Sequence, residues 1–283
     1  MKKLKTSYKI GNKTYSFLYY GKIHKGKDEV LLDNQDNLLK KTSFNDVGYK
    51  VVNFDKSLSH KIIKNSIEKI IKKLIIKHSN NKRLIKNFKL EKYHLYVDSD
   101  IHYKIIGALS KGINFNKSIS RIKLEKLVSK TLKIKVSTLN KKYKKKNYKY
   151  YLDPKKFNLR IIRPSKNDFN PPHRDVYFDN HANGVNIYIP ISGSNKKSSL
   201  PIFPRSHLIN ESKVSRTSLN SYFNGVKFSV PVIFKTIPSL KLLRPDPKKN
   251  QMMIFSSNLI HGGGLNENID ITRVSLELRF WRI

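Results

Sequence analysis

The second half of the chain consists of short apolar segments separated by turn-forming residues, and this pattern limits the fold more than any other feature. Clusters of Pro, Gly, Asn and Ser interrupt the apolar runs, as they do between strands. The runs lie at 158–163, 185–191, 200–203, 230–237, 251–255 and 271–281. Short strands at this spacing predict a β-sandwich or jelly roll.

The first half of the chain has a different rhythm. Residues 1–45 alternate apolar and polar side chains between Gly-containing turns, which predicts two or three short strands. Residues 58–78 place Ile and Leu at helical spacing with Lys on the other face, which predicts an amphipathic helix. Further helices are expected at 83–93, at 100–110, and from Ser118 or Ser120 to Leu132.

Together these patterns predict an α+β fold, in which a double-stranded β-helix (jelly-roll, cupin-like) core carries a packed N-terminal helical layer. We expect a single domain over residues 1–283, because no repeat and no linker interrupts it. Its expected parts are a β extension at 1–45, a mainly helical layer at 46–140 and the jelly-roll core at 148–283.

The composition excludes several kinds of chemistry. The chain has no cysteine, so disulfides, thiolate metal sites, iron–sulfur clusters and cysteine nucleophiles are excluded, and a metal would need His, Asp or Glu ligands. The segment Met1–Lys5 is basic but is not followed by the apolar stretch of a secretory signal. No apolar run reaches the length of a membrane span. We therefore expect a cytoplasmic protein without a membrane span.

The formal net charge is +38, and most of it lies in the first half of the chain. Residues 1–150 have an excess of 27 positive charges, against 11 for residues 151–283. This charge could form a surface for nucleic acid, anionic lipid or an anionic substrate. We favour a compositional excess of Lys on solvated faces, because the lysines are dispersed. The basic and aromatic stretch 141–151 could bind phosphates and stack on bases, but a surface loop is the preferred interpretation.

Three residues form a pattern that suits iron. His173 and Asp175 are two residues apart, so on an extended segment both side chains point to the same side. His261 opens the glycine-rich sequence His261–Gly264 directly after an apolar strand, and glycine allows the backbone to approach a ligand closely. Two imidazoles and one carboxylate can hold Fe(II) on one face and leave the other face open for a co-substrate and oxygen.

The last predicted strand adds a candidate anion site. Arg273 and Ser275 lie on its polar face, and together they could donate hydrogen bonds to the carboxylate of a co-substrate. The opposite face, from Val274 to Phe280, is apolar. The polar face could line the inside of a barrel, or it could simply face water.

Several segments resemble the Fe(II)/2-oxoglutarate-dependent dioxygenases, in the phytanoyl-CoA dioxygenase-like branch. The resemblance runs from about Gly48 to the C-terminus, and the segments that carry it are Gly48–Val52, Leu159–Pro164, His173–Asp175, Leu200–His207 and Met253–Gly263. Within the fourth segment, Arg205 stands where that family has glycine.

The resemblance implies a role for each part of the pattern. It implies that His173, Asp175 and His261 bind Fe(II), and that Arg273 and Ser275 bind the C5 carboxylate of 2-oxoglutarate. With O2, such an enzyme hydroxylates a small organic substrate and releases succinate and CO2. Related halogenases replace the carboxylate ligand with a small residue, so Asp175 disfavours halogenation.

A competing motif is present. His173-Arg174-Asp175 followed by Asn180 also fits the protein-kinase catalytic loop. The sequence lacks the glycine-rich loop, the Asp-Phe-Gly motif and the Ala-Pro-Glu motif of that family, so we treat the match as coincidence.

Other polar residues near the metal motifs are candidates for contact with the substrate, which the positive charge suggests is anionic. They are Arg163, Tyr177, His181, Asn186 and Arg279. For His207 we expect a structural hydrogen bond, because the three-residue iron site is complete without it. Two alternatives stay open: a non-catalytic jelly-roll binding protein, and a protein that binds or modifies nucleic acid through its basic surface. The sequence does not indicate an oligomeric state.

Overall fold

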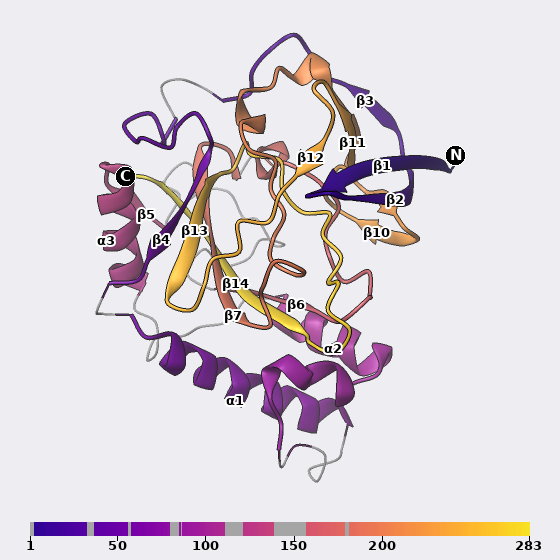
Figure 1. Cartoon of the computed structure of the whole chain (residues 1–283), viewed down its shortest axis with the longest axis vertical. Coiled ribbons are helices and arrows are strands. Elements are labelled where there is room, and N and C mark those ends of the chain that lie inside the picture. The colour runs from indigo at the N-terminus through magenta and orange to yellow at the C-terminus, as the bar shows by residue number, and fades with distance from the viewer. Residues whose placement is uncertain are drawn as a thin grey trace, which may run out of the picture.

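The computed structural model describes residues 3–32, 37–55, 58–79, 85, 87–110, 121–138, 157–178 and 181–283. Its largest element is an antiparallel sheet in the order β4-β13-β7-β14-β5, with β6 also paired to β14 (Figure 1). These strands are β4 (Tyr49–Asn53), β5 (Val136–Ser137), β6 (Asn158–Ile162), β7 (Gly184–Ser192), β13 (Gln251–Ser256) and β14 (Arg273–Arg282). The protein is therefore rich in sheet with few helices, as a jelly-roll core requires.

Two smaller sheets combine the N-terminal strands with strands from the second half of the chain. One has the order β10-β9-β2-β1-β12 and the other β11-β8-β3. Their strands are β1 (Leu4–Ile10), β2 (Lys13–Tyr20), β3 (Ile23–Lys25), β8 (Val214–Thr217), β9 (Ser221–Phe223), β10 (Val226–Phe228), β11 (Ile233–Thr236) and β12 (Lys241–Leu242). Strands are thus present within residues 1–45, and they pair with strands from residues 214–242.

Helices cover the outer face of the main sheet. These are α1 (His60–Ser79), α2 (Ser99–Leu109) and α3 (Arg121–Leu132), and Figure 1 shows α1 and α2 below the sheet with α3 beside β5. The Ile stripe of α1 is fully buried and joins one apolar cluster with Ile187 and Ile189 of β7 and with Leu276 of β14. Burial of this stripe is what fixes the helix on the sheet, since isolated helices of this length are marginal in water.

The face of β14 that points away from the helices is polar, and it is buried near Arg273 and Ser275. The apolar residues of β14 from Val274 to Phe280 belong to the cluster under the helices, so the alternating residues point to the opposite side. On that side Arg273 is 3% exposed and Ser275 is 0% exposed. The polar face of the last strand therefore lines the interior and does not face water.

Two expected elements differ from the structure. The helix expected at 83–93 falls partly outside the described residues, and the described part forms a 3₁₀ helix at Leu90–Leu95. Long-range contacts fix this turn: the Glu91 carbonyl accepts from Thr272 N and the Glu91 carboxylate accepts from Ser192. Residues 200–203 form no regular strand, and only Ile202 makes single bridges, to Leu243 and His261.

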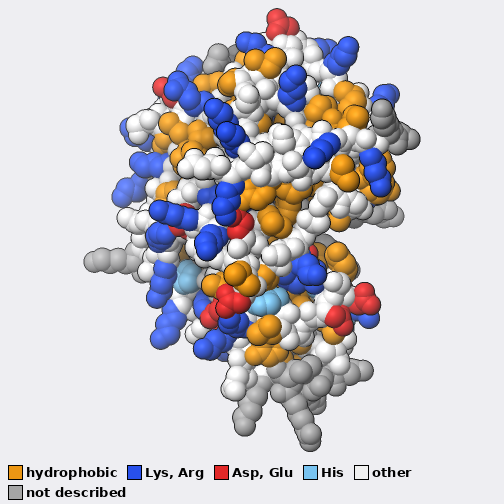
Figure 2. Space-filling view, turned by 45° about the vertical axis from the view of Figure 1, so that its right-hand side comes forward, with side chains coloured by type: hydrophobic (Ala, Val, Ile, Leu, Met, Phe, Trp, Pro, Cys, Tyr) orange, Lys and Arg blue, Asp and Glu red, His pale blue; other side chains and the backbone are white. Residues whose placement is uncertain are grey.

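One face of the molecule carries dispersed positive charge (Figure 2). Figure 2 shows Lys and Arg side chains scattered among apolar and uncharged ones over the visible face, without one continuous stripe. This distribution agrees with a compositional excess of Lys. The stretch 141–151 lies outside the described residues. Among the helices that the structure describes, none is long and apolar enough to cross a membrane.

Candidate metal and co-substrate site

His173, Asp175 and His261 come together in the interior, where their potential ligand atoms all lie within 4.8 Å of one another. Asp175 Oδ1 is 3.3 Å from His173 Nε2 and 3.7 Å from His261 Nε2. Ligand atoms about 2.1 Å from a shared ion lie about 3 Å apart. All three residues are buried. The donor set and its spacing fit one divalent metal ion bound on a single face.

The backbone holds the two histidines in register. His173 N donates to His261 O at 2.9 Å, and His261 N donates to His173 O at 3.0 Å. Asp175 N donates to Ser257 O at 3.0 Å, which ties the third residue to the loop that precedes His261. Arg174 between them is extended, so the side chains on either side of it share one face. Segments almost ninety residues apart are thus paired directly at the site.

Both imidazoles are set in the tautomer that a metal needs. His173 Nδ1 lies 2.8 Å from the Pro171 carbonyl oxygen, and His261 Nδ1 lies 2.9 Å from that of Leu259. A carbonyl can only accept, so each Nδ1 carries the proton and each Nε2 keeps its lone pair. Burial lowers the pKa of His261 to about 4, which keeps its ring neutral at ordinary pH.

Arg279 orients the carboxylate. Its Nε and Nη2 both donate to Asp175 Oδ2, at 2.9 and 2.7 Å. This leaves Oδ1 directed to the two imidazoles. Burial raises the pKa of Asp175, but the Arg279 charge and the facing histidines outweigh it, so the pKa is held well below its usual value. Asp175 is therefore an anion, as a metal ligand must be.

Glycine is required in the loop after His261. Gly262 and Gly263 have φ of +93° and +76°, which side chains rarely adopt. A Cβ on Gly262 would lie 2.7 Å from Pro171 O, and one on Gly263 would lie 2.5 Å from the Tyr8 hydroxyl. Tyr8 on β1 in turn donates to Gly263 O at 2.9 Å. The N-terminal strand thus supports the loop that carries His261.

A buried ion pair anchors the segment from His173 to Asp175. Arg174 is completely buried, and its guanidinium donates to the Glu211 carboxylate and to the Ser206 and Ile209 carbonyls. Tyr177 also donates to Glu211, at 3.1 Å. This network gives Arg174, between the two proposed ligands, a structural role. Tyr177 belongs to the same network and helps to hold the segment in place.

Next to the metal-ligating group lies a pocket with a positive end. Its lining includes His173, His261, Gly264, Arg273 and Arg279. Arg273 Nη1 donates to Ser198 O at 3.2 Å, while its buried Nε makes no hydrogen bond. No described carboxylate pairs with Arg273, and the buried hydroxyl of Ser275 also lacks a partner. A buried guanidinium without a counter-ion is costly unless an anion binds beside it.

The remaining candidates have different surroundings. Arg163 makes a two-pronged ion pair with Asp168, at 2.8 and 3.0 Å, so its guanidinium is already engaged. His181 Nδ1 and both polar atoms of the Asn186 amide are buried without a hydrogen-bond partner. Asn186 lies directly opposite Arg279 in the sheet. His207 Nε2 lies 2.7 Å from Asn45 O, which is the structural hydrogen bond expected for it.

Several residues of the site were not anticipated. Arg160 and Glu277 line the pocket and form an ion pair at 3.2 Å. Arg160 could have been found from its position on β6 between the apolar residues Leu159 and Ile161. Tyr8, Glu211 and Arg244 carry no local sequence signal, because only the fold brings them near the site.

No protein-family model matches the sequence, and no curated protein matches it either. Among solved structures the chain is similar to EctD from S. alaskensis with 2-oxoglutarate and 5-hydroxyectoine, at 12% identity and TM-score 0.42, over 94% of this chain and 86% of that one. It is also similar to the non-heme monooxygenase ThoJ, at 14% identity and TM-score 0.42, over 87% and 77% of the two chains. A third similar structure is the non-heme alpha ketoglutarate dependent epimerase SnoN from nogalamycin biosynthesis, at 10% identity and TM-score 0.39, over 84% and 79%.

Proposed function

We propose that this protein is a non-haem oxygenase that uses Fe(II) and 2-oxoglutarate. The observation that carries the proposal is the placement of two imidazoles and one carboxylate beside a buried arginine with which no described carboxylate pairs. The two imidazoles and the carboxylate suit Fe(II) with open positions on one face. The arginine suits the far carboxylate of a bound 2-oxo acid.

Each side chain has a distinct proposed role. His173, Asp175 and His261 would bind the iron through Nε2, Oδ1 and Nε2. Bound iron would supply the reaction of O2 with the 2-oxo acid, which yields succinate and CO2 and inserts one oxygen atom into the substrate. Arg273 and Ser275 would bind the C5 carboxylate and so orient the 2-oxo acid toward the iron. Arg279 would hold Asp175 in its ligating orientation.

The residues that line the pocket favour a small, polar organic substrate. Its lining changes from the glycine-rich loop near His261 to Phe169, Asn170 and the Arg160–Glu277 pair. The Arg160 side chain is 34% exposed, so it is a cation that an anionic group entering the pocket would meet. Hydroxylation is the proposed outcome, within a single oxygenase domain that includes the N-terminal strands.

Succinate formation tests this proposal even while the substrate is unidentified. Protein loaded with Fe(II) should convert 2-oxoglutarate slowly to succinate in air, because O2 can react with the 2-oxo acid at the iron even when no substrate is bound. The same sample under argon, and the His173→Ala and Asp175→Ala variants in air, should form none. If wild-type protein binds the metal and 2-oxoglutarate but forms no succinate in air, the protein is a binding module and the oxygenase proposal is wrong.

A further inference from the structure

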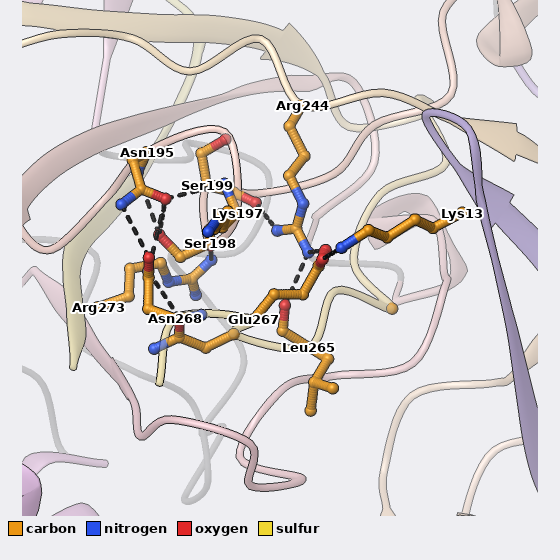
Figure 3. Close-up of polar contacts among 12 residues, drawn as sticks. Lys13, Asn195, Lys197, Ser198, Ser199, Arg244, Leu265, Glu267, Asn268 and Arg273 are labelled. Carbon is orange, nitrogen blue, oxygen red and sulfur yellow. Dashed lines mark hydrogen bonds and ion pairs between the residues drawn. The ribbon is translucent and has the colours of Figure 1, made fainter. Parts of the chain in front are cut away.

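A second buried guanidinium, that of Arg244, lies beside the proposed co-substrate anchor. Its side chain is 5% exposed and follows directly after β12 and the bridge residue Leu243. Arg244 Nη1 donates to the Ser199 carbonyl, while Arg273 Nη1 donates to the Ser198 carbonyl. Figure 3 shows the two arginines approaching the same loop, Arg273 from β14 and Arg244 from the segment that follows β12. They therefore hold two consecutive carbonyls of one turn.

Arg244 also holds the loop at Gly264 and Leu265, which forms another wall of the pocket. Its Nη2 donates to the Leu265 carbonyl at 2.7 Å. A Cβ added to Gly264 would lie 3.1 Å from Arg244 Nη1, and Gly264 lines the pocket together with Arg273. The guanidinium thus stands directly behind the pocket wall, between the loop of Ser199 and the loop that carries His261.

The local charges leave an excess of positive charge. Glu267 Oε1 is 3.5 Å from Arg244 Nη2, and the same carboxylate also pairs with Lys13 on β2. Arg273 has no described carboxylate partner. Burial and the nearby Arg273 charge lower the pKa of Arg244. Glu267 is therefore shared between Arg244 and Lys13, no described carboxylate pairs with Arg273, and an anion bound beside Arg273 would relieve the excess of positive charge.

We propose that Arg244 is a positioning and specificity residue that, with Arg273, makes the pocket select 2-oxo acids bearing a terminal carboxylate. This inference rests on the proposed function. Arg244 holds the loop that Arg273 binds, and it adds a buried positive charge next to the site of the terminal carboxylate. Binding of the 2-oxo acid end at the iron does not depend on it.

The test compares two ligands of equal chain length that differ in the terminal carboxylate: 2-oxoglutarate and 2-oxopentanoate. Dissociation constants would be measured anaerobically with Fe(II)-loaded protein by the visible absorption of the complex and by calorimetry. Wild-type protein should prefer 2-oxoglutarate strongly. Arg244→Gln should raise the dissociation constant of 2-oxoglutarate by about 10-fold or more and leave that of 2-oxopentanoate nearly unchanged. Arg244→Lys, which keeps the charge, should retain most of the preference.

Glu267→Gln provides a test of opposite sign. Removal of the compensating carboxylate should tighten 2-oxoglutarate binding about 2-fold or more, which a loss of structural support would not do. Lys235→Gln removes a charge from an exposed position on β11 and should change the affinity for neither acid. Equal weakening of both acids by Arg244→Gln, or weaker 2-oxoglutarate binding in Glu267→Gln, would overturn the inference. Failure of wild-type protein to bind either acid would instead overturn the proposed function.

Discussion

Arg279 donates two hydrogen bonds to one oxygen of Asp175 and leaves the other oxygen facing the imidazoles of His173 and His261. The arginine lies on β14, six residues beyond Arg273. The last strand therefore contributes to both ends of the proposed site. In the proposed function, Arg273 would bind the co-substrate, and Arg279 would determine which carboxylate oxygen is available to the metal.

Substitution of Arg279 should weaken metal binding. Arg279→Met keeps the bulk of the side chain but frees Asp175 to rotate, and loss of such an orienting partner typically costs about 10-fold or more in metal affinity. The measurement is anaerobic titration with Fe(II), or with Co(II) as a spectroscopic substitute. Arg282→Gln, at the exposed end of the same strand, serves as the control. Unchanged affinity in Arg279→Met would refute the orienting role.

The buried pair of Arg174 and Glu211 should be a large determinant of stability. Glu211→Gln leaves Arg174 buried and uncompensated, and breaking such a pair costs about 3 to 5 kcal/mol. Urea denaturation of metal-free protein would measure this loss. Glu68→Gln removes a partly exposed pairing with Lys72, one turn away on α1, and should cost at most about 0.5 kcal/mol. Similar losses in the two variants would show that the buried network is not what anchors the metal segment.

The hydroxyl of Tyr8 should stabilise the loop after His261. Tyr8→Phe leaves the buried Gly263 carbonyl without its donor, at a cost of about 1 kcal/mol in the free energy of unfolding. Tyr103→Phe is the matched control, because Tyr103 is 59% exposed. Denaturant titration compares the two. An unaltered midpoint for Tyr8→Phe would mean that the N-terminal strand does not hold the loop through this bond.

The protein should lose stability between about pH 6.5 and pH 4. Burial lowers the pKa of His102 to about 4, so the folded protein keeps this ring neutral while the unfolded chain protonates it near its usual pKa. The unfolded state then binds more protons, and stability falls as the pH falls through this range. Calorimetry on metal-free protein should show this decrease.

The effect is shared with other buried histidines, since the pKa of His181 is lowered to about 3. His102→Gln should therefore reduce the decrease without abolishing it. His24→Gln, on the exposed strand β3, should show nearly the same decrease in stability as the wild-type protein. A melting temperature of wild-type protein that does not change from pH 7 to pH 5 would contradict the account.

The local parts of the site could be predicted from the sequence. The two-residue spacing of His173 and Asp175 predicts a shared face, and Arg174 is extended between them. The alternation in β14 correctly separates the residues under the helices from Arg273 and Ser275. Both inferences use periodicities that the backbone imposes on neighbouring residues, so they do not depend on the rest of the fold.

The long-range parts could not be predicted in this way. Arg174 is bound by Glu211, and the turn at Ser198 is held by Arg244, yet no pattern links these positions in the sequence. The expected helix at 83–93 is wrong in its described part because contacts of Glu91 with distant residues override local propensity. Arg163, a substrate candidate by its position, is engaged by Asp168 instead.

The most direct test of the central claim is the anaerobic absorption spectrum of the protein with Fe(II) and 2-oxoglutarate. We predict a weak visible charge-transfer band that appears only when both are present. The band should be absent in His173→Ala and Asp175→Ala, and Arg273→Met should need much more 2-oxoglutarate to reach it. If wild-type protein gives no band and binds neither ligand, the converging residues are not a site for Fe(II) and 2-oxoglutarate.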